Sequence, residues 1–334
     1  MRASFLVKAG QVEVRGIDAP ELESDEVLIR VAAVGVCGSD THYYQHGKIG
    51  PYVVDEPLIL GHEASGTIVA VGSAVSNDRV GKRVSIEPQR PCKNCEQCLA
   101  GRYNLCPSME FYATPPIHGA FAELVKIQSE FAFDIPDNVS FEAAALIEPL
   151  SVGIWAAKRA EIKQGSRVLV AGAGPIGIIM AQTAAALGAA EIIVTDISPE
   201  RREFALQWGA TSVLDPRVDQ VEGLEVDAFI DASGVASAVA QGIKAVGPAG
   251  RVILVGMGND DVSLPVSYIQ NKEIWVSGVF RYANTWPTGI QMIAEGKVNL
   301  DVLVTHKFGL DEVEAALNSA KLPGAMKALV LPTE

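Results

Sequence analysis

Residues 168–177 read Val168-Leu169-Val170-Ala171-Gly172-Ala173-Gly174-Pro175-Ile176-Gly177. An apolar run of strand type leads into a G-x-G-x-x-G spacing, which opens a long apolar segment of helical type. In that setting Gly172 permits a tight turn, Gly174 lets the backbone approach a pyrophosphate, and Gly177 lets the helix meet the strand. The helix N-terminus supplies N–H groups to the anion. The stretch therefore predicts a dinucleotide site on a parallel α/β sheet.

The sequence around this stretch alternates in the same way from about residue 150. Apolar strands joined by Ala-rich helices are typical of a parallel sheet with crossover helices. Strands are predicted at 168–171, 191–195, 227–231, 251–255 and 274–279, and helices at 175–187, 199–208 and 235–246.

Asp196 follows the second predicted strand, about 20 residues after the glycine turn, where a carboxylate binds the hydroxyls of the adenosine ribose. A carboxylate there repels a 2′-phosphate, and Arg202 lies well past the turn, so NAD is favoured over NADP. The further residues predicted to contact the cofactor are Pro175, Ile176, Arg201, Val255, Val279, Phe280 and Arg281.

The first 145 residues differ in texture, because short strands such as 26–31 and 66–72 alternate with Gly/Pro turns. Ser140 is placed to cap a helix that leads into the second half. Beyond residue 280, helices are predicted at 286–295 and 311–320 and a strand at 325–331, in a segment expected to return to the first domain. The predicted domains are 1–147, 148–280 and 281–334, the first rich in β-structure and the second of α/β class.

The composition excludes several classes of function. The formal net charge is −13 without a Lys/Arg cluster, which disfavours nucleic acid as a partner. No apolar run reaches the length of a membrane span, and residues 1–10 lack the layout of a secretory signal. We therefore expect a cytoplasmic protein with no membrane partner.

Four of the five cysteines are Cys92, Cys95, Cys98 and Cys106, within fifteen residues of a polar loop. Four thiolates at this spacing close a tetrahedral zinc site and hold a loop that has little core of its own. A secreted disulfide framework would be shorter and denser in cysteine. The loop therefore predicts a structural Zn²⁺, with no open position for chemistry.

A second metal site is predicted from the fifth cysteine, Cys37, together with His62 and a carboxylate, either Glu63 or Glu148. Three protein ligands and one open position are the arrangement of catalytic zinc. Ser39 and His42 lie close enough in sequence to Cys37 to accept the proton that an alcohol loses. A buried cysteine beside a serine is also compatible with simple core packing, so this hypothesis depends on the rest of the chain.

These motifs resemble those of the zinc-dependent medium-chain alcohol dehydrogenases and, within them, the polyol (sorbitol and xylitol) dehydrogenase branch. The general likeness lies in Gly61-His62-Glu63-x₂-Gly66-x₅-Gly72, the four-cysteine loop and the glycine turn. The likeness to the polyol branch lies in segments 35–44, 111–116, 148–153 and 278–287.

The resemblance implies a GroES-like catalytic domain, a Rossmann domain and an active site between them. It implies that Cys37, His62 and either Glu63 or Glu148 bind the catalytic zinc. An acidic residue at position 148 favours the polyol dehydrogenase branch. Substrate contacts are implied for Arg281, Tyr282, Tyr43, Phe111 and Thr114, and the catalytic residues would be Ser39, His42 and Glu148.

The expected protein is an NAD-dependent zinc enzyme, with two Zn²⁺ per subunit, that oxidises a secondary hydroxyl of a sorbitol-, xylitol- or galactitol-type polyol to a ketose. One alternative is a zinc dehydrogenase for another secondary alcohol, of threonine or 2,3-butanediol type. A third hypothesis is a nucleotide-binding or structural protein without turnover. A homodimer or homotetramer is expected by analogy, with strand 274–279 able to pair across a two-fold axis.

Overall fold

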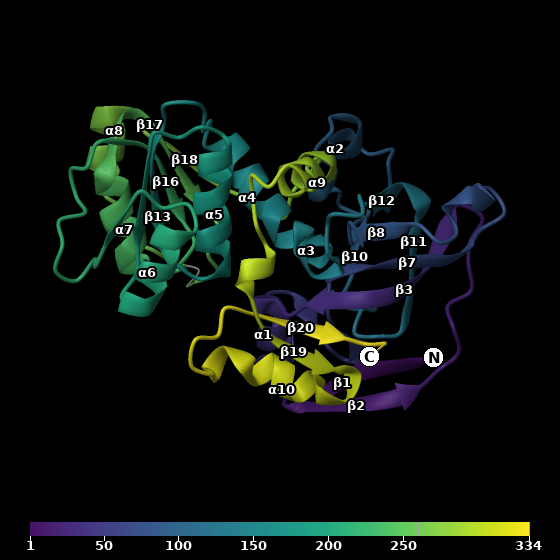
Figure 1. Cartoon of the computed structure of the whole chain (residues 1–334). Helices are drawn as coiled ribbons and strands as arrows, with labels where there is room; N and C mark the ends of the chain where they lie inside the picture. Colours follow the sequence, from purple (N-terminus) through teal and green to yellow (C-terminus); the bar gives the residue numbers. More distant parts are fainter. Residues whose placement is uncertain (259–260, 334) are drawn as a thin grey trace. The chain divides into compact units, whose positions relative to one another are not determined.

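The computed structural model describes residues 1–258 and 261–333, which form two compact units (Figure 1). Unit 1 contains residues 1–148, 286–294 and 299–334, and unit 2 contains residues 149–285 and 295–298. In the part of the chain that the structure describes, no helix combines the length and the apolarity needed to cross a membrane.

Unit 2 is built on a six-stranded parallel sheet in the order β15-β14-β13-β16-β17-β18. The strand order reverses between β13 and β16, as in the doubly wound fold, where ligands bind beyond the carboxyl ends of the strands. The predicted α/β class is thus confirmed. The strands are β13 (Arg167–Ala171), β14 (Glu191–Thr195), β15 (Ser212–Leu214), β16 (Val226–Asp231), β17 (Val246–Leu254) and β18 (Trp275–Gly278).

The helices that connect these strands are α5 (Pro175–Ala186), α6 (Pro199–Gln207), α7 (Ala236–Ala245) and α8 (Val266–Lys272), after the entry helix α4 (Ile147–Arg159). The strand predicted to begin at 251 begins at 246, because the Gly/Pro run 247–250, which suggests a turn, continues the strand with Ala249 at φ 59°. Short β15 and α8 were not predicted, since neither has a clear apolar periodicity.

Unit 1 is centred on β3 (Glu26–Gly35), which pairs with β7 (Glu63–Val71), β11 (Leu124–Gln128) and β20 (Lys327–Leu331). The sheet order is β12-β8-β7-β3-β20-β19, with β11 also on β3. Three smaller sheets are β2-β1-β6, β10-β9 and β4-β5. The remaining strands are β1 (Arg2–Lys8), β2 (Gln11–Gly16), β4 (Lys48–Ile49), β5 (Tyr52–Val53), β6 (Leu58–Ile59), β8 (Arg83–Ile86), β9 (Gln89–Arg90), β10 (Glu110–Phe111), β12 (Ala132–Asp134) and β19 (Val304–Gly309).

Unit 1 also contains helices α1 (Gly38–His46), α2 (Glu96–Leu99), α3 (Phe141–Ala145), α9 (Trp286–Ala294) and α10 (Val313–Asn318). Ser140 caps α3 as predicted, because its hydroxyl accepts the Ala143 N–H at 2.9 Å. The single helix predicted at 311–320 is wrong in detail: α10 is flanked by 3₁₀ turns at 310–312 and 319–321. The yellow C-terminal strand β20 lies beside β3 in the main sheet (Figure 1).

Candidate active site and metal centres

The predicted catalytic metal ligands meet at the end of the central strand of unit 1. Cys37 lies between β3 and α1, while His62 immediately precedes β7, the neighbour of β3. One ligand atom from each of Cys37, His62 and Glu63 lies within 4.8 Å of the others. The sheet therefore brings together two segments that are about 25 residues apart in sequence, with the donor types that zinc prefers.

Asp40 holds this cluster in place and was not among the predicted site residues. Its side chain is fully buried, and it accepts the N–H groups of Cys37 and Gly61, both at 2.9 Å. The Asp40 Oδ1 also lies 3.6 Å from the His62 Nδ1. A carboxylate on the outer nitrogen of a histidine fixes the ring so that its other nitrogen faces a metal.

Asp40 and His62 each favour the charged form of the other. Burial opposes ionisation of Asp40, but His62 and the two backbone N–H groups hold its pKa below the ordinary value. Burial likewise disfavours the imidazolium, yet Asp40 and the Cys37 thiol raise the His62 pKa well above 6.5. A metal ion binds the neutral imidazole, so metal binding here competes with protonation of His62.

Glu63 provides the test of whether a metal fits here. It is 99% buried, and its Oε2 has no hydrogen-bond partner among the described residues, whereas Oε1 accepts a bond from Lys327. A buried unsatisfied carboxylate oxygen is costly, and a cation held with Cys37 and His62 would remove that cost. Glu148, on the first turn of α4, is buried but is not part of this three-residue group.

Two of the other predicted catalytic residues lie on α1, three positions apart on one helix face. Ser39 is half-buried, and His42 is exposed with its ring 4.6 Å from that of His46. The polar side chain nearest to Cys37 along the helix is therefore half-buried, and the one a turn further on is exposed.

The predicted substrate residues of unit 1 have different surroundings. Phe111 is buried with its ring 5.5 Å from the His62 ring, so it lies beside the cluster. Tyr43 is buried in the core of unit 1 and Thr114 is half-buried. Of the three, the described contacts tie Phe111 directly to a candidate ligand.

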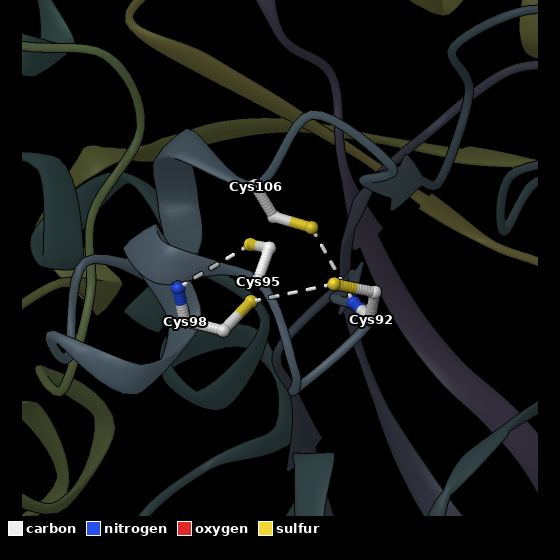
Figure 2. Close-up of side chains that lie close together, drawn as sticks. All are labelled: Cys92, Cys95, Cys98 and Cys106. Atoms are coloured by element: carbon white, nitrogen blue, oxygen red, sulfur yellow. Dashed lines mark hydrogen bonds between the residues drawn. The ribbon is translucent and has the colours of Figure 1, made fainter.

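The four other cysteines converge in the loop that contains α2 (Figure 2). Their sulfur atoms lie within 4.8 Å of one another, and Cys92 Sγ is 3.9 Å from Cys98 Sγ. Two backbone N–H groups donate to sulfur atoms: that of Cys92 to Cys106 Sγ, with an N–S distance of 3.4 Å, and that of Cys98 to Cys95 Sγ, at 3.5 Å. This is the geometry of a closed Cys₄ site.

The acidities of these thiols show why a cation fits. Backbone N–H groups, led by that of Asn94, lower the pKa of Cys92 to about 6, whereas burial and the neighbouring sulfurs raise that of Cys98 to about 12. One thiolate thus makes the next harder to form. Zn²⁺ supplies the charge that lets all four ionise.

The glycine turn of unit 2 has the form that pyrophosphate binding needs. Gly172 has φ 96°, and a Cβ at Gly177 would lie 1.8 Å from the Gly172 carbonyl oxygen. A Cβ at Gly174 would meet only an Arg201 nitrogen, at 3.7 Å. Helix α5 begins at Pro175 without a side-chain cap, which leaves its first N–H groups to an anion.

Asp196 follows β14 and also braces this turn. Its Oδ2 accepts the Ala173 N–H and its Oδ1 accepts the Ser198 N–H, both at 2.8 Å. Arg202, the neighbouring cation, is engaged elsewhere, since it donates to the Asp196 carbonyl at 2.7 Å and to Asp215 at 3.1 Å. The 2′-phosphate of NADP would therefore face the Asp196 carboxylate, and the Arg202 guanidinium would not be free to neutralise it.

The remaining cofactor residues follow other strands of the same sheet. Val255 comes directly after β17, and Val279 and Phe280 after β18, so they share the carboxyl edge with the glycine turn. Arg281 has φ 55° and places its guanidinium 4.8 Å from the Phe280 ring, while Tyr282 is fully buried. The roles assigned to these residues stay predictions.

Four buried charged residues of unit 1 were missed by sequence reasoning: Glu26, Asp40, Glu87 and Lys327. Asp40 had a signal, because an acid three residues after the residue that precedes a helix is a capping pattern. Lys327 also had one, since it begins an apolar run, 328–331, in which a charge needs a partner. Glu87 had none beyond its place after an apolar strand.

A Rossmann unit with a glycine turn, together with a β-rich unit that carries a Cys-His-Glu cluster and a Cys₄ loop, defines a zinc-binding dehydrogenase. Two families match in the corresponding places: the alcohol dehydrogenase GroES-like domain over residues 23–137 and the zinc-binding dehydrogenase over residues 175–295.

Individual relatives are similar to this chain in sequence or structure over almost its whole length. Sorbitol dehydrogenase of Bacillus subtilis (strain 168) is 43% identical over 329 residues, covering 96% of this chain and 93% of the relative. The structure of L-idonate 5-dehydrogenase from Escherichia coli K-12 has a TM-score of 0.93 at 28% identity, covering 99% and 98% of the two chains. That of 2R,3R-butanediol dehydrogenase from Bacillus subtilis has a TM-score of 0.91 at 31% identity, covering 99% of each. The chain belongs to the zinc-dependent medium-chain dehydrogenases, in their polyol dehydrogenase branch.

Proposed function

We propose that this chain oxidises a secondary hydroxyl of an open-chain polyol to a ketose with NAD⁺. The observation that carries the proposal is the Cys37–His62–Glu63 cluster, with its unsatisfied buried oxygen, in a chain 43% identical to a sorbitol dehydrogenase. In this role Cys37, His62 and Glu63 hold the catalytic zinc and the four clustered cysteines hold the structural one.

When bound, zinc supplies a Lewis acid toward a substrate hydroxyl, and NAD⁺ supplies the hydride acceptor. The chain's own residues do the rest. Asp40 keeps His62 in the ligating orientation, and buried Phe111 excludes water on one side of the cluster. The hydroxyl of half-buried Ser39 accepts the alcohol proton while releasing its own, and exposed His42 passes that proton to solvent.

Substrate selection is proposed to rest on groups that bond the neighbouring hydroxyls: Glu148, Tyr43, Thr114, Arg281 and Tyr282. A site built to hydrogen-bond hydroxyl groups rejects analogues that lack them, because its buried polar groups would stay unpaired. Simple alkanols should therefore be poor substrates.

Steady-state rates with NAD⁺ and NADP⁺ on sorbitol, xylitol and galactitol test this proposal, with threonine, 2,3-butanediol and a short alkanol for comparison. The polyols should give the highest kcat/KM. The similarity to 2R,3R-butanediol dehydrogenase makes a small vicinal diol the second candidate, and a preference for 2,3-butanediol would establish it. Binding of NADH without turnover of any of these substrates would refute both candidates.

We also propose a homodimer or homotetramer. Strand β18 is at the edge of its sheet, and Trp275 and Phe280 at and beyond it are 65% and 52% exposed. An exposed apolar edge strand is a template for pairing with another chain. Light scattering on the purified protein measures the assembly, and a monomer would contradict it.

A further inference from the structure

Lys327 is the basic side chain at the catalytic cluster, and it comes from the C-terminal return strand β20. Every residue of that strand is buried, and Lys327 itself is 7% exposed. Its Nζ donates to the Glu63 Oε1, and the charges of Cys37 and Glu148 act on it as well. The ammonium is therefore bonded to Glu63 and lies in the electrostatic field of two further acidic groups.

Stability does not account for a lysine at this position. Removing an ammonium and a carboxylate from water costs about as much as their attraction returns, so a buried ion pair is weak evidence for stability. An apolar side chain would suit the buried strand at least as well. The position calls for an explanation in terms of what Lys327 does to Glu63.

The neighbouring backbone limits the Glu63 carboxylate from the other side. Gly35 pairs with Glu63 across β3 and β7, and a Cβ at position 35 would lie 1.9 Å from Oε2 and 2.9 Å from Cδ of Glu63. The carboxylate therefore occupies the space that the missing side chain of Gly35 leaves. Lys327 holds one of its oxygens, and the other is buried without a hydrogen bond among the described residues.

We propose that Lys327 is a positioning residue for the catalytic metal: it fixes Oε1 of Glu63, so that Oε2 is presented to the ion beside Cys37 and His62. Gly35 provides the room for this arrangement. The inference rests on the proposed function, because it concerns the ligand set of that same site. It also selects Glu63 over Glu148 as the third ligand.

The test is the zinc affinity of the purified full-length chain, measured by competition with a chromophoric chelator. Partners that orient a metal ligand are worth about 10- to 100-fold in affinity, so Lys327→Met should weaken one of the two zinc sites by about that factor. The four-cysteine site should keep its ion. The visible spectrum of the Co²⁺-substituted protein should change at the weakened site only.

Two comparisons separate positioning from a general effect on folding. Lys307→Met is the matched control, because Lys307 pairs with Glu142 at the surface on the adjacent strand β19, and it should leave both zinc sites unchanged. In a Glu63→Gln background, Lys327→Met should cause little further loss, since the lysine acts through that carboxylate. Gly35→Ala should reproduce the selective loss without removing any charge.

Several outcomes would overturn the inference. The zinc affinity of Lys327→Met could stay within threefold of the wild type, or the catalytic site could bind zinc more tightly. The substitution could also reduce zinc affinity by the same factor in the Glu63→Gln background. The four-cysteine site also lies in unit 1, so retention of its zinc ion reports that unit 1 of each variant is folded, and NADH binding, followed by fluorescence, reports the same for unit 2. If the wild type itself neither held two zinc ions nor oxidised a polyol, the proposed function would fail instead, so the two failures are distinguishable.

Discussion

Glu87 makes the stability of unit 1 depend on pH in a way that one substitution should remove. It is 99% buried after β8, and its Oε1 accepts bonds from the Tyr103 hydroxyl at 2.8 Å and the Gln89 amide at 3.0 Å. Burial outweighs these bonds and, with the Glu148 charge, raises the pKa of Glu87 to about 7 from an ordinary 4.5. Glu87→Gln mimics the protonated form with little change in shape.

The sign follows from proton linkage. Between about pH 4.5 and pH 7 the unfolded chain has lost this proton and the folded chain keeps it, so the free energy of unfolding falls as the pH rises. With these two pKa values, the ionisation of Glu87 lowers the free energy of unfolding, relative to acidic pH, by about 1.4 kcal/mol at pH 5.5 and about 3.3 kcal/mol at pH 8. The stability of Glu87→Gln relative to the wild type should therefore improve by about 2 kcal/mol between these pH values.

Thermal unfolding of zinc-loaded wild type and variant at pH 5.5 and pH 8 measures this difference. For a domain of 150–250 residues, about 2 kcal/mol corresponds to roughly 4–8 °C in Tm. Comparing the two proteins at each pH cancels the titration of other groups. A Tm difference that stays constant with pH, or moves in favour of the wild type at pH 8, would refute the reasoning.

Three further predictions concern the metal and cofactor sites. Asp196→Ala should weaken NAD⁺ use relative to NADP⁺, because the carboxylate that repels a 2′-phosphate is gone, and the ratio of the two kcat/KM values checks it. Gly177→Ala should reduce NADH binding at least tenfold, since its Cβ would lie 1.8 Å from the Gly172 oxygen; fluorescence titration measures this, and intact zinc content shows that unit 1 is unaffected. Cys98→Ser should lose one zinc ion and several degrees of Tm while the kcat of the folded enzyme is retained, because a Cys₄ site adds folding energy and takes no part in the reaction.

Sequence reasoning was accurate where a local pattern determines structure. The strand predicted at 191–195 has the observed bounds, and the helices predicted at 175, 199 and 286 begin where expected. The strand is a short apolar run, and each helix has a local start signal: Pro175 after Gly174, Pro199 after the capping Ser198, and Pro287 in the first turn of α9. The four-cysteine group was predictable for a related reason: its ligands are close in sequence.

Features that depend on tertiary contacts were missed. Helix α1 is too short and polar to show an apolar face, and it is held by the bonds of buried Asp40 to Cys37 and Gly61. The burial of Trp286, whose indole donates to Ser85 at 2.9 Å, joins residues about 200 apart. The pairing of Lys327 with Glu63 depends on which strand the chain's end reaches. The Asp40–Cys37 bond follows a local capping pattern, but the other contacts join distant segments and have no local signature that determines them.

The catalytic cluster depends on the register of one strand. Gly35, at the end of β3, is opposite Glu63 on β7 and opposite Leu329 on β20, two residues from Lys327. Side chains alternate along a strand, so a slip of one residue in either pairing would turn the carboxylate or the ammonium to the opposite face of the sheet. The apolar residues of β3 and β20 are buried and set that register. Core packing in unit 1 therefore also determines the chemistry, because the same pairings that bury these strands aim Glu63 and Lys327 at one point.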